Sequence, residues 1–167
     1  HNGDGAPDLD PLDGGVQAEC LFLLEAPGGK AVGSGFVSRN NPDETAKNFF
    51  QLNEQAGLPR GRTVVWNVVP WYVGTGTRIR AVTDADIQTS EPHLRELIRL
   101  LPGLRAVVLV GRKAQRVETI FERHPSCAVF KCPHPSPLSL NGRPEKRTEI
   151  LGCLKAVAAH LATPTRS

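Results

Sequence analysis

Four short apolar runs alternate with segments that carry helix signals, and this alternation constrains the fold more than any other feature of the sequence. Continuous apolar runs of this length are typical of parallel strands that are buried on both faces. The sequence therefore predicts an α/β fold, a three-layer α/β/α sandwich around a central four-stranded parallel sheet with right-handed crossovers. The four runs are Cys20 to Leu24, Thr63 to Val69, Arg105 to Val110 and Cys127 to Lys131.

Four helices are predicted in the intervening segments. Asn41 and Glu44 form a capping box at the start of the first helix, and Gly57 is suited to end it. Pro92 lies inside the second helix and is expected to break or kink its first half. The predicted ranges are 41 to 57, 84 to 101, a third helix that opens at Gly111, and 144 to 161.

The composition is that of an ordinary globular chain. At 167 residues the sequence fits one domain over residues 1–167, and residues 1–15, rich in Gly, Asp and Pro, predict a coil that leads into it. Hydrophobic residues make up 40% and charged residues 22%, which excludes a disordered or fibrous protein. No apolar run is long enough to span a bilayer, so no membrane partner is expected. The chain opens with His1 and contains no Met, which indicates that its initiator residue is missing.

The cysteines and the net charge narrow the class of site. The four cysteines are scattered without a CxxC pair, so the sequence predicts no zinc or iron-sulfur site, no other metal and no cofactor. Reduced thiols favour a cytoplasmic location. The net charge of +3 permits nucleic-acid binding without arguing for it.

Every unusual segment follows one of the predicted strands. These segments are 25–36, 67–76 and 133–141. Because ligands of open parallel sheets bind at the carboxyl ends of the strands, we expect the functional site there.

Five motifs, four of which overlap these segments, resemble those of the uracil-DNA glycosylase superfamily. Residues 134–139 read HPSPLS, which is similar to a family loop of the same sequence, and residues 24–28 read LEAPG, close to the GEAPG motif of the iron-sulfur uracil glycosylases. The motifs occur in the family's order and in the expected strand and loop context, and the resemblance covers roughly residues 20 to 155. The other three are GFV at 35–37, WNVV at 66–69 and VGRKAQ at 110–115.

The resemblance implies an enzyme that flips uracil out of DNA and hydrolyses its N-glycosidic bond, leaving an abasic site. Phe36 would stack on the base, and the Asn67 amide would read the N3 hydrogen and O4 of uracil. His134 would donate to uracil O2 and stabilise the leaving group. Ser136, Ser139 and Arg143, the last with Lys146 and Arg147, would bind DNA phosphates, while Leu138 would wedge into the base stack.

The sequence departs from the family's patterns at two positions. In the family, one of these residues activates the attacking water and the other excludes the methyl group of thymine. Where GQDPYH-type enzymes carry an Asp and a Tyr, this chain has Ala26 and Gly28, which we place in the uracil pocket. Glu25 is the nearest carboxylate to activate the water, with Asp10 or Asp13 as alternatives. Trp71 or Tyr72 is the candidate to exclude thymine. The chain also lacks the four cluster cysteines, which implies a variant without an iron-sulfur cluster.

The sequence thus predicts a monomeric, monofunctional uracil-DNA glycosylase that acts on single- or double-stranded DNA. Two alternatives stay open. One is a non-catalytic binder of uracil- or abasic-site DNA, because Ala26 replaces a catalytic carboxylate. The other is a nucleoside or nucleotide enzyme on the same fold, although a free nucleoside requires neither the Leu138 wedge nor phosphate contacts.

Overall fold

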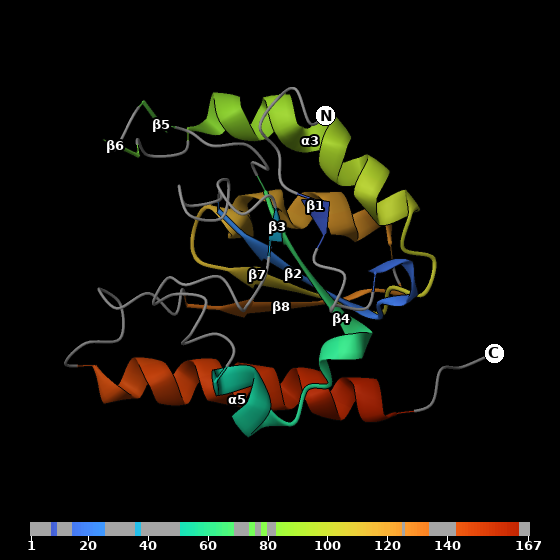
Figure 1. Ribbon diagram of the computed structural model, residues 1–167, viewed down its shortest axis with the longest axis vertical. Coiled ribbons are helices and arrows are strands. Elements are labelled where there is room, and N and C mark those ends of the chain that lie inside the picture. Colours follow the sequence, from blue (N-terminus) through green and yellow to red (C-terminus); the bar gives the residue numbers. More distant parts are fainter. Residues whose placement is uncertain are drawn as a thin grey trace.

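The computed structural model consists of a central sheet with helices on both faces (Figure 1). Its seven longer elements are β2 (Cys20–Leu24), β4 (Thr63–Asn67), α3 (Asp84–Arg99), β7 (Ala106–Val110), η4 (Ala114–Arg123), β8 (Ala128–Cys132) and α5 (Pro144–Ala162). The structure describes residues 8–9, 15–25, 36–37, 51–68, 74–75, 78–79, 83–124, 126–133 and 143–163.

The four longer strands form one all-parallel sheet in the order β4-β2-β7-β8. The first of these strands in the sequence, β2, therefore lies inside the sheet and pairs on both sides, with Leu21 opposite Val64 on β4 and Val107 on β7. Cys20 to Leu23 have no exposed surface, which explains why this run shows no polar alternation. The predicted four-stranded parallel sheet is confirmed.

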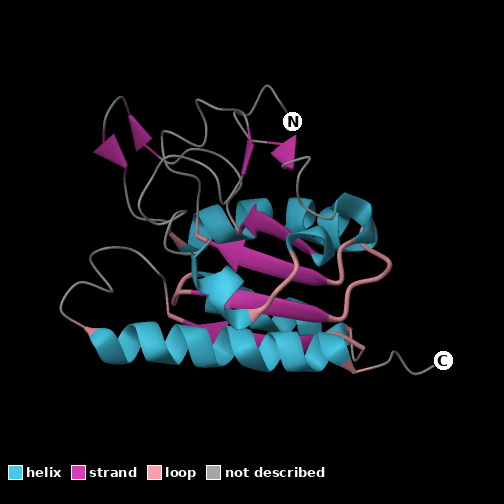
Figure 2. Cartoon of the chain, turned by 60° about the horizontal axis from the view of Figure 1, so that its bottom comes forward, coloured by secondary structure: helices cyan, strands magenta, loops and turns pink. Residues whose placement is uncertain are grey.

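Two apolar clusters cover the two faces of the sheet. On one face α3 and η4 pack through residues such as Leu94, Leu97 and Ile120. On the other face α5 packs through Ile150, Leu154 and Val157, together with residues of the helical segment 51–56. Figure 2 shows the resulting layers. In the described part of the chain, no helix is both long enough and apolar enough to cross a membrane.

The helices differ from the prediction in two respects. Pro92 lies within α3, so the expected break is wrong, and only the alternative of a kink remains. Apolar side chains on both sides of the proline hold the helix against the sheet. The helix after Gly111 is a 3-10 helix of 10 residues that begins at Ala114. Its buried residues Ala114, Val117 and Ile120 recur every third position, which matches the three residues per turn of a 3-10 helix.

Shorter elements complete the description. Asp8–Leu9 (β1), in the predicted lead-in, pairs with Phe36–Val37 (β3), and Gly74–Thr75 (β5) pairs with Arg78–Ile79 (β6). Two further 3-10 turns are η2 (Gly15–Gln17) and η3 (Arg60–Arg62). The segment 51–56 ends at Gly57, whose φ of +76° favours glycine, as the sequence predicts.

An ion network joins the amino edge of the sheet to the end of α5. The Arg62 guanidinium donates two hydrogen bonds to the Glu19 carboxylate, at 2.9 and 2.8 Å, and Arg105 donates a third at 3.1 Å. Both arginines also donate to the carbonyl oxygen of Leu161. The hydrogen bond from Arg62 is the main cause that lowers the pKa of Glu19. This network fixes the carboxyl end of α5 against the starts of β2, β4 and β7.

We predict that Glu19→Gln destabilises the fold in a pH-dependent way. Because the folded-state pKa of Glu19 lies below its ordinary value of 4.5, the stabilisation is present above that pH and is lost as the pH falls below it. The variant should lose about 1 to 2 kcal/mol of unfolding free energy at pH 7. Urea titrations of both proteins from pH 7 to pH 3 measure this, and a difference that does not shrink below pH 4.5 would contradict it. Glu96→Gln, which breaks an exposed pair with Arg99, is the control and should change little.

Asn53 is a buried amide for which the described residues offer no partner. Its side chain is 4% exposed, and neither Nδ2 nor Oδ1 has a hydrogen-bond partner within the described residues. Its neighbour Leu52 belongs to the apolar cluster beneath α5. A buried polar atom left unpaired costs free energy that an apolar side chain of similar size does not.

Asn53→Leu should therefore stabilise the protein, by about 1 kcal/mol or more of unfolding free energy. Asn53→Asp, which buries a charge at the same place, should destabilise it. Chemical denaturation at pH 7 compares the two variants with the parent chain. A Leu variant less stable than the parent would show that the amide has a partner that contributes to folding.

Candidate functional site

The carboxyl ends of the four parallel strands bring the candidate residues to one edge of the sheet. Asn67 ends β4, and Glu25 directly follows β2. Gly111 follows β7, and Pro133 follows β8 immediately before the HPSPLS segment. Because the order is β4-β2-β7-β8, these positions follow one another along that edge, with about 4.8 Å between neighbouring strands.

Asn67 is a buried amide at the end of an apolar strand. It is 4% exposed and pairs with Leu24, and the following amide of Val68 donates to the Leu24 carbonyl at 2.7 Å. Alternation along β4 places Asn67 on the same face as Val65, which packs in the cluster beneath α5. A buried amide at a strand end is a specific donor and acceptor pair held by rigid backbone.

Glu25 lines a pocket of about 420 Å³ at the same edge. The other lining residues come from the end of β7 and the turn into η4. They are Val110, Gly111, Arg112, Lys113 and Arg116. Gly111 has a φ of +86°, a conformation that favours glycine, and it turns the chain sharply after β7. The turn gathers three cations around one carboxylate.

The three cations differ in their partners. The Arg116 guanidinium donates to Asp84 in the first turn of α3, which holds this side chain in place. Within the described part of the chain, no ion pair engages Arg112 or Lys113. Both stay available for an anion from outside, such as a phosphate. From the sequence this segment resembles a family junction but has no predicted role, because nothing in the sequence reveals that it lines the same pocket as Glu25.

Glu25 and Asn67 lie on opposite faces of the sheet. Asn67 points to the α5 face, whereas the pocket of Glu25 is lined by the turn into η4, which packs on the other face. They are neighbours along the edge, since the partner of Asn67 is the residue before Glu25. A ligand that contacts both must therefore lie across the edge of the sheet, over the end of β2.

Arg143 is the other described candidate at this edge. The far end of α5 is bound to the amino edge of the sheet, where Arg105 donates to the carbonyl oxygens of His160 and Leu161. A helix of 19 residues spans about 28 Å, so its first residue, Pro144, reaches the carboxyl edge. Arg143 is exposed directly before Pro144.

The remaining candidates are partly or wholly beyond what the structure describes. The backbone of Phe36 belongs to β3 and pairs with Asp8, and its side chain is not described. The other candidates lie outside the described residues. They are Ala26, Gly28, His134, Ser136, Leu138 and Ser139, with the alternatives Asp10, Asp13, Trp71 and Tyr72.

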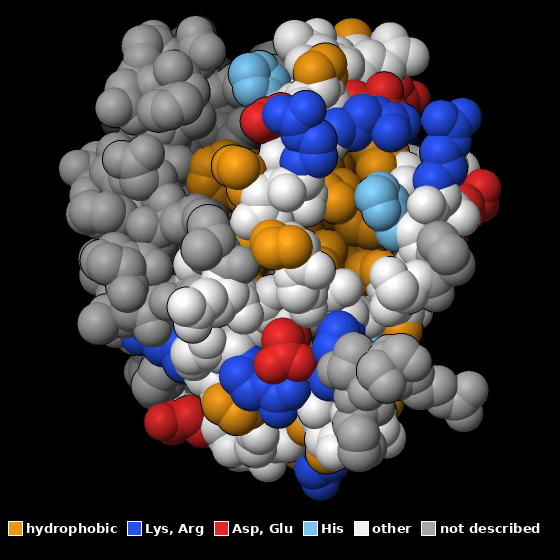
Figure 3. All heavy atoms as spheres, turned by 90° about the vertical axis from the view of Figure 1, so that its right-hand side faces the viewer, with side chains coloured by type: hydrophobic (Ala, Val, Ile, Leu, Met, Phe, Trp, Pro, Cys, Tyr) orange, Lys and Arg blue, Asp and Glu red, His pale blue; other side chains and the backbone are white. Residues whose placement is uncertain are grey.

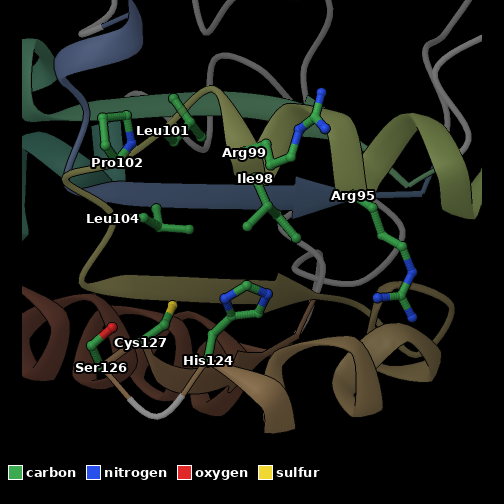
Figure 4. A pocket seen from close by; sticks show the side chains of 9 residues that line it. All are labelled: Arg95, Ile98, Arg99, Leu101, Pro102, Leu104, His124, Ser126 and Cys127. Carbon is green, nitrogen blue, oxygen red and sulfur yellow. The ribbon is translucent and has the colours of Figure 1, made fainter.

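A second pocket, of about 370 Å³, lies at the opposite end of the sheet. Its floor includes Ile98, Leu101 and Leu104, and Arg95 and His124 extend from α3 and the end of η4 (Figure 4). The surface view of this end of the molecule shows Lys and Arg side chains in a row beside exposed apolar surface (Figure 3). None of the residues that line this pocket is a candidate from the sequence, so it is separate from the candidate site.

Neither a metal cluster nor a disulfide is found among the described residues. No three His, Cys, Asp or Glu side chains there are grouped to hold a metal ion. All four cysteines carry free thiols. The described carboxyl edge of the sheet presents one amide, one carboxylate and several cations.

Comparisons with known proteins agree with the fold and supply a family. The family model described as "Uracil DNA glycosylase superfamily" matches residues 12–157. A solution NMR structure of a "putative Uracil DNA glycosylase" from Methanosarcina acetivorans is similar, with a TM-score of 0.55 over 88% of this chain and 94% of that chain. Its sequence identity of 19% means that the likeness shows the fold alone. None of the curated proteins compared with the sequence matches it significantly.

Proposed function

Because this chain belongs to the uracil-DNA glycosylase superfamily, we propose that it removes uracil from DNA by hydrolysing the N-glycosidic bond. The reaction leaves an abasic site and needs neither metal nor cofactor. The enzyme acts as a monomer in the cytoplasm. The observation that carries the proposal is the buried amide of Asn67 at the carboxyl end of β4, where a flipped base would enter.

Base recognition is assigned to Asn67. An amide offers one acceptor to the N3 hydrogen of uracil and one donor to O4, whereas cytosine presents the opposite pattern at these positions. The rigid end of β4 supports this role, because a reader must be held in place to discriminate. Phe36 stacks on the base, and Ala26 and Gly28 line the pocket around it.

Leaving-group stabilisation is assigned to His134. A neutral imidazole that donates to uracil O2 stabilises the negative charge that develops as the glycosidic bond stretches. Glu25 is proposed to activate the attacking water. For this, the sugar must lie over the end of β2, so that Asn67 and Glu25 act from the two faces of the sheet.

DNA is held by contacts around the same edge. Ser136 and Ser139 bind phosphates, and Leu138 fills the space left in the stack by the flipped nucleotide. Arg143 adds a phosphate contact at the start of α5. Arg112 and Lys113, which form no ion pair with a described acidic side chain, extend the phosphate-binding surface toward η4.

One alternative is favoured by a specific observation. Glu25 opens to the η4 face and Asn67 to the α5 face, so a chain that reads uracil without activating water is chemically consistent with this edge. Such a protein would bind uracil- or abasic-site DNA without cleaving the glycosidic bond.

Abasic-site formation separates the two functions. Single-stranded and duplex oligonucleotides that carry one uracil are incubated with excess protein, with and without chelator, and treated with alkali. We expect a strand break at uracil only after alkali, equal in both chelator arms, and none at cytosine. If the protein binds the DNA but gives no alkali-sensitive product, the glycosylase proposal is wrong and the non-catalytic binder is correct. If chelator abolishes the product, the proposal of a reaction without metal is wrong.

Asn67→Asp should abolish uracil excision and introduce weak cytosine excision, because the carboxylate cannot donate to O4 of uracil. Asn53→Asp is the matched control, because Asn53 and Asn67 are both 4% exposed. Asn53 does not lie at the carboxyl edge of the sheet. If both variants lose uracil excision together with stability, the loss reflects the buried charge. Undiminished uracil excision by Asn67→Asp would exclude Asn67 as the reader.

His134→Ala should lower the single-turnover rate of uracil excision by about two to three orders of magnitude. His124→Ala, at the pocket on the opposite end of the sheet, is the control and should leave the rate unchanged. Glu25→Gln should also slow the reaction. A silent Glu25→Gln would move water activation to another group, whereas a silent His134→Ala would refute the leaving-group mechanism.

Arg112→Gln combined with Lys113→Gln should reduce the salt dependence of DNA binding. Each lost phosphate contact lowers the slope of log K against log salt by about 0.7 to 0.9, so the double variant should lose about 1 to 2 units of slope. Arg95→Gln combined with Arg99→Gln removes two charges from the other pocket and serves as the control. Equal slopes for the Arg112 and Lys113 variant and the parent chain would show that this turn does not touch DNA.

A further inference from the structure

Two cysteines meet between β8 and α5. Cys132 is the last residue of β8 and is 2% exposed, and Cys153 lies on α5 and is half-buried. Both belong to the packing on the α5 face of the sheet, where Cys153 lies against the cluster that contains Cys132. The proposed function uses neither thiol.

The contacts of Cys153 place its sulfur beside Cys132. Its thiol donates to the Lys131 carbonyl oxygen at 3.5 Å, and that carbonyl belongs to the peptide bond that leads into Cys132. The two thiols are also close enough that each is the largest influence on the pKa of the other. A disulfide requires the two sulfur atoms to approach to about 2.05 Å.

The two thiols are electrostatically unequal. The hydrogen bond with Cys153, followed by burial, raises the pKa of Cys132 well above its usual value. The same hydrogen bond lowers the pKa of Cys153, against the opposing effects of burial and of the Glu149 carboxylate. The thiolate therefore forms first at Cys153, which is the more exposed of the two.

We propose that Cys132 and Cys153 form an oxidation site that hydroperoxides convert into a disulfide between β8 and α5. The Cys153 thiolate attacks one oxygen of hydrogen peroxide, the O–O bond breaks, and the products are a sulfenic acid on Cys153 and, after protonation, water. The Cys132 sulfur then attacks the sulfenic sulfur, loses its proton and displaces a second water. Two thiols are oxidised to one disulfide, and one peroxide is reduced to two waters.

The position of this bond gives it a structural consequence. It closes the chain from the end of β8 to the third turn of α5, and this stretch contains residues 134–142, which carry the HPSPLS motif. This proposal goes beyond the proposed function and does not rest on it. The disulfide is detected by mass spectrometry, which requires no measurement of uracil excision.

Cys127 provides an internal control for accessibility. It lines the second pocket, so a small oxidant can approach it (Figure 4). Burial raises the pKa of its thiol to about 11, and its hydrogen-bond partner is the Ala128 carbonyl oxygen. No other cysteine is among the residues that line that pocket. Cys127 thus lacks the thiolate and the second thiol that the proposed site has.

The experiment treats the reduced full chain with hydrogen peroxide at pH 7, blocks the remaining thiols by alkylation and measures intact mass and peptides. We expect a loss of two hydrogens, alkylation at only two of the four cysteines, and a crosslinked peptide pair that contains Cys132 and Cys153. Dithiothreitol should restore all four thiols. The melting temperature of the oxidised form should be higher, because the bond constrains the unfolded chain.

Variants separate this site from general oxidation. Cys153→Ser should abolish the crosslink, and Cys127→Ser, the matched control, should retain it. Cys132→Ser should also abolish the crosslink. If this variant does not fold, peptide mapping of the parent chain still shows which two cysteines are joined. Four intact thiols after treatment, stable oxygen addition at Cys153 without a crosslink, or a crosslink that involves Cys20 or Cys127 would each overturn the proposal.

Discussion

The pairing of β2 on both sides is the constraint on which the rest of the structure depends. Its backbone is hydrogen-bonded to β4 and β7, and all three run in the same direction. A strand in that position must be apolar on both faces, so it can carry functional groups only after it ends. Glu25 and Asn67 occur at this point, so the position of these two candidate residues follows from where the central strands stop.

The amino and carboxyl edges of the sheet differ in how their charged side chains are paired. At the amino edge the Glu19 carboxylate is fully matched by Arg62 and Arg105, which also bind the last carbonyls of α5. At the carboxyl edge the cations outnumber the carboxylate, since Arg112, Lys113 and Arg116 surround Glu25, and no ion pair among the described side chains engages Arg112 or Lys113. Matched charges stabilise a fold, whereas unmatched cations at a strand edge favour an anionic ligand.

Much of the fold could be predicted because it follows from short-range patterns. The apolar runs gave the four parallel strands to within a residue or two, and the proline at 144 gave the start of α5. Of the two outcomes expected for Pro92, a break of the helix is wrong, because tertiary packing holds α3 together across the proline. The 3-10 form of η4 was missed, since a spacing of three also occurs on one face of an α-helix.

The positions of three candidate residues were predictable, whereas their arrangement was not. The sequence placed Asn67, Glu25 and Arg143 at strand or helix ends, and the structure finds all three toward the carboxyl edge. Asn67 and Glu25 belong to different faces because Glu25 comes one residue after the partner of Asn67. The prediction did not give this register, and it placed the end of β4 two residues too late. The cations around Glu25 depend on the turn at Gly111, which no residue spacing reveals.

The central claim is that uracil is read at the end of β4, and nuclear magnetic resonance tests it directly. The side-chain amide of Asn67 gives two assignable proton signals, which can be followed during titration with DNA that contains a non-hydrolysable 2′-fluoro-deoxyuridine. The account predicts large shifts of these signals with that DNA and small ones with the cytosine equivalent. Unchanged Asn67 signals, with shifts confined to residues of the pocket between α3 and η4, would contradict it.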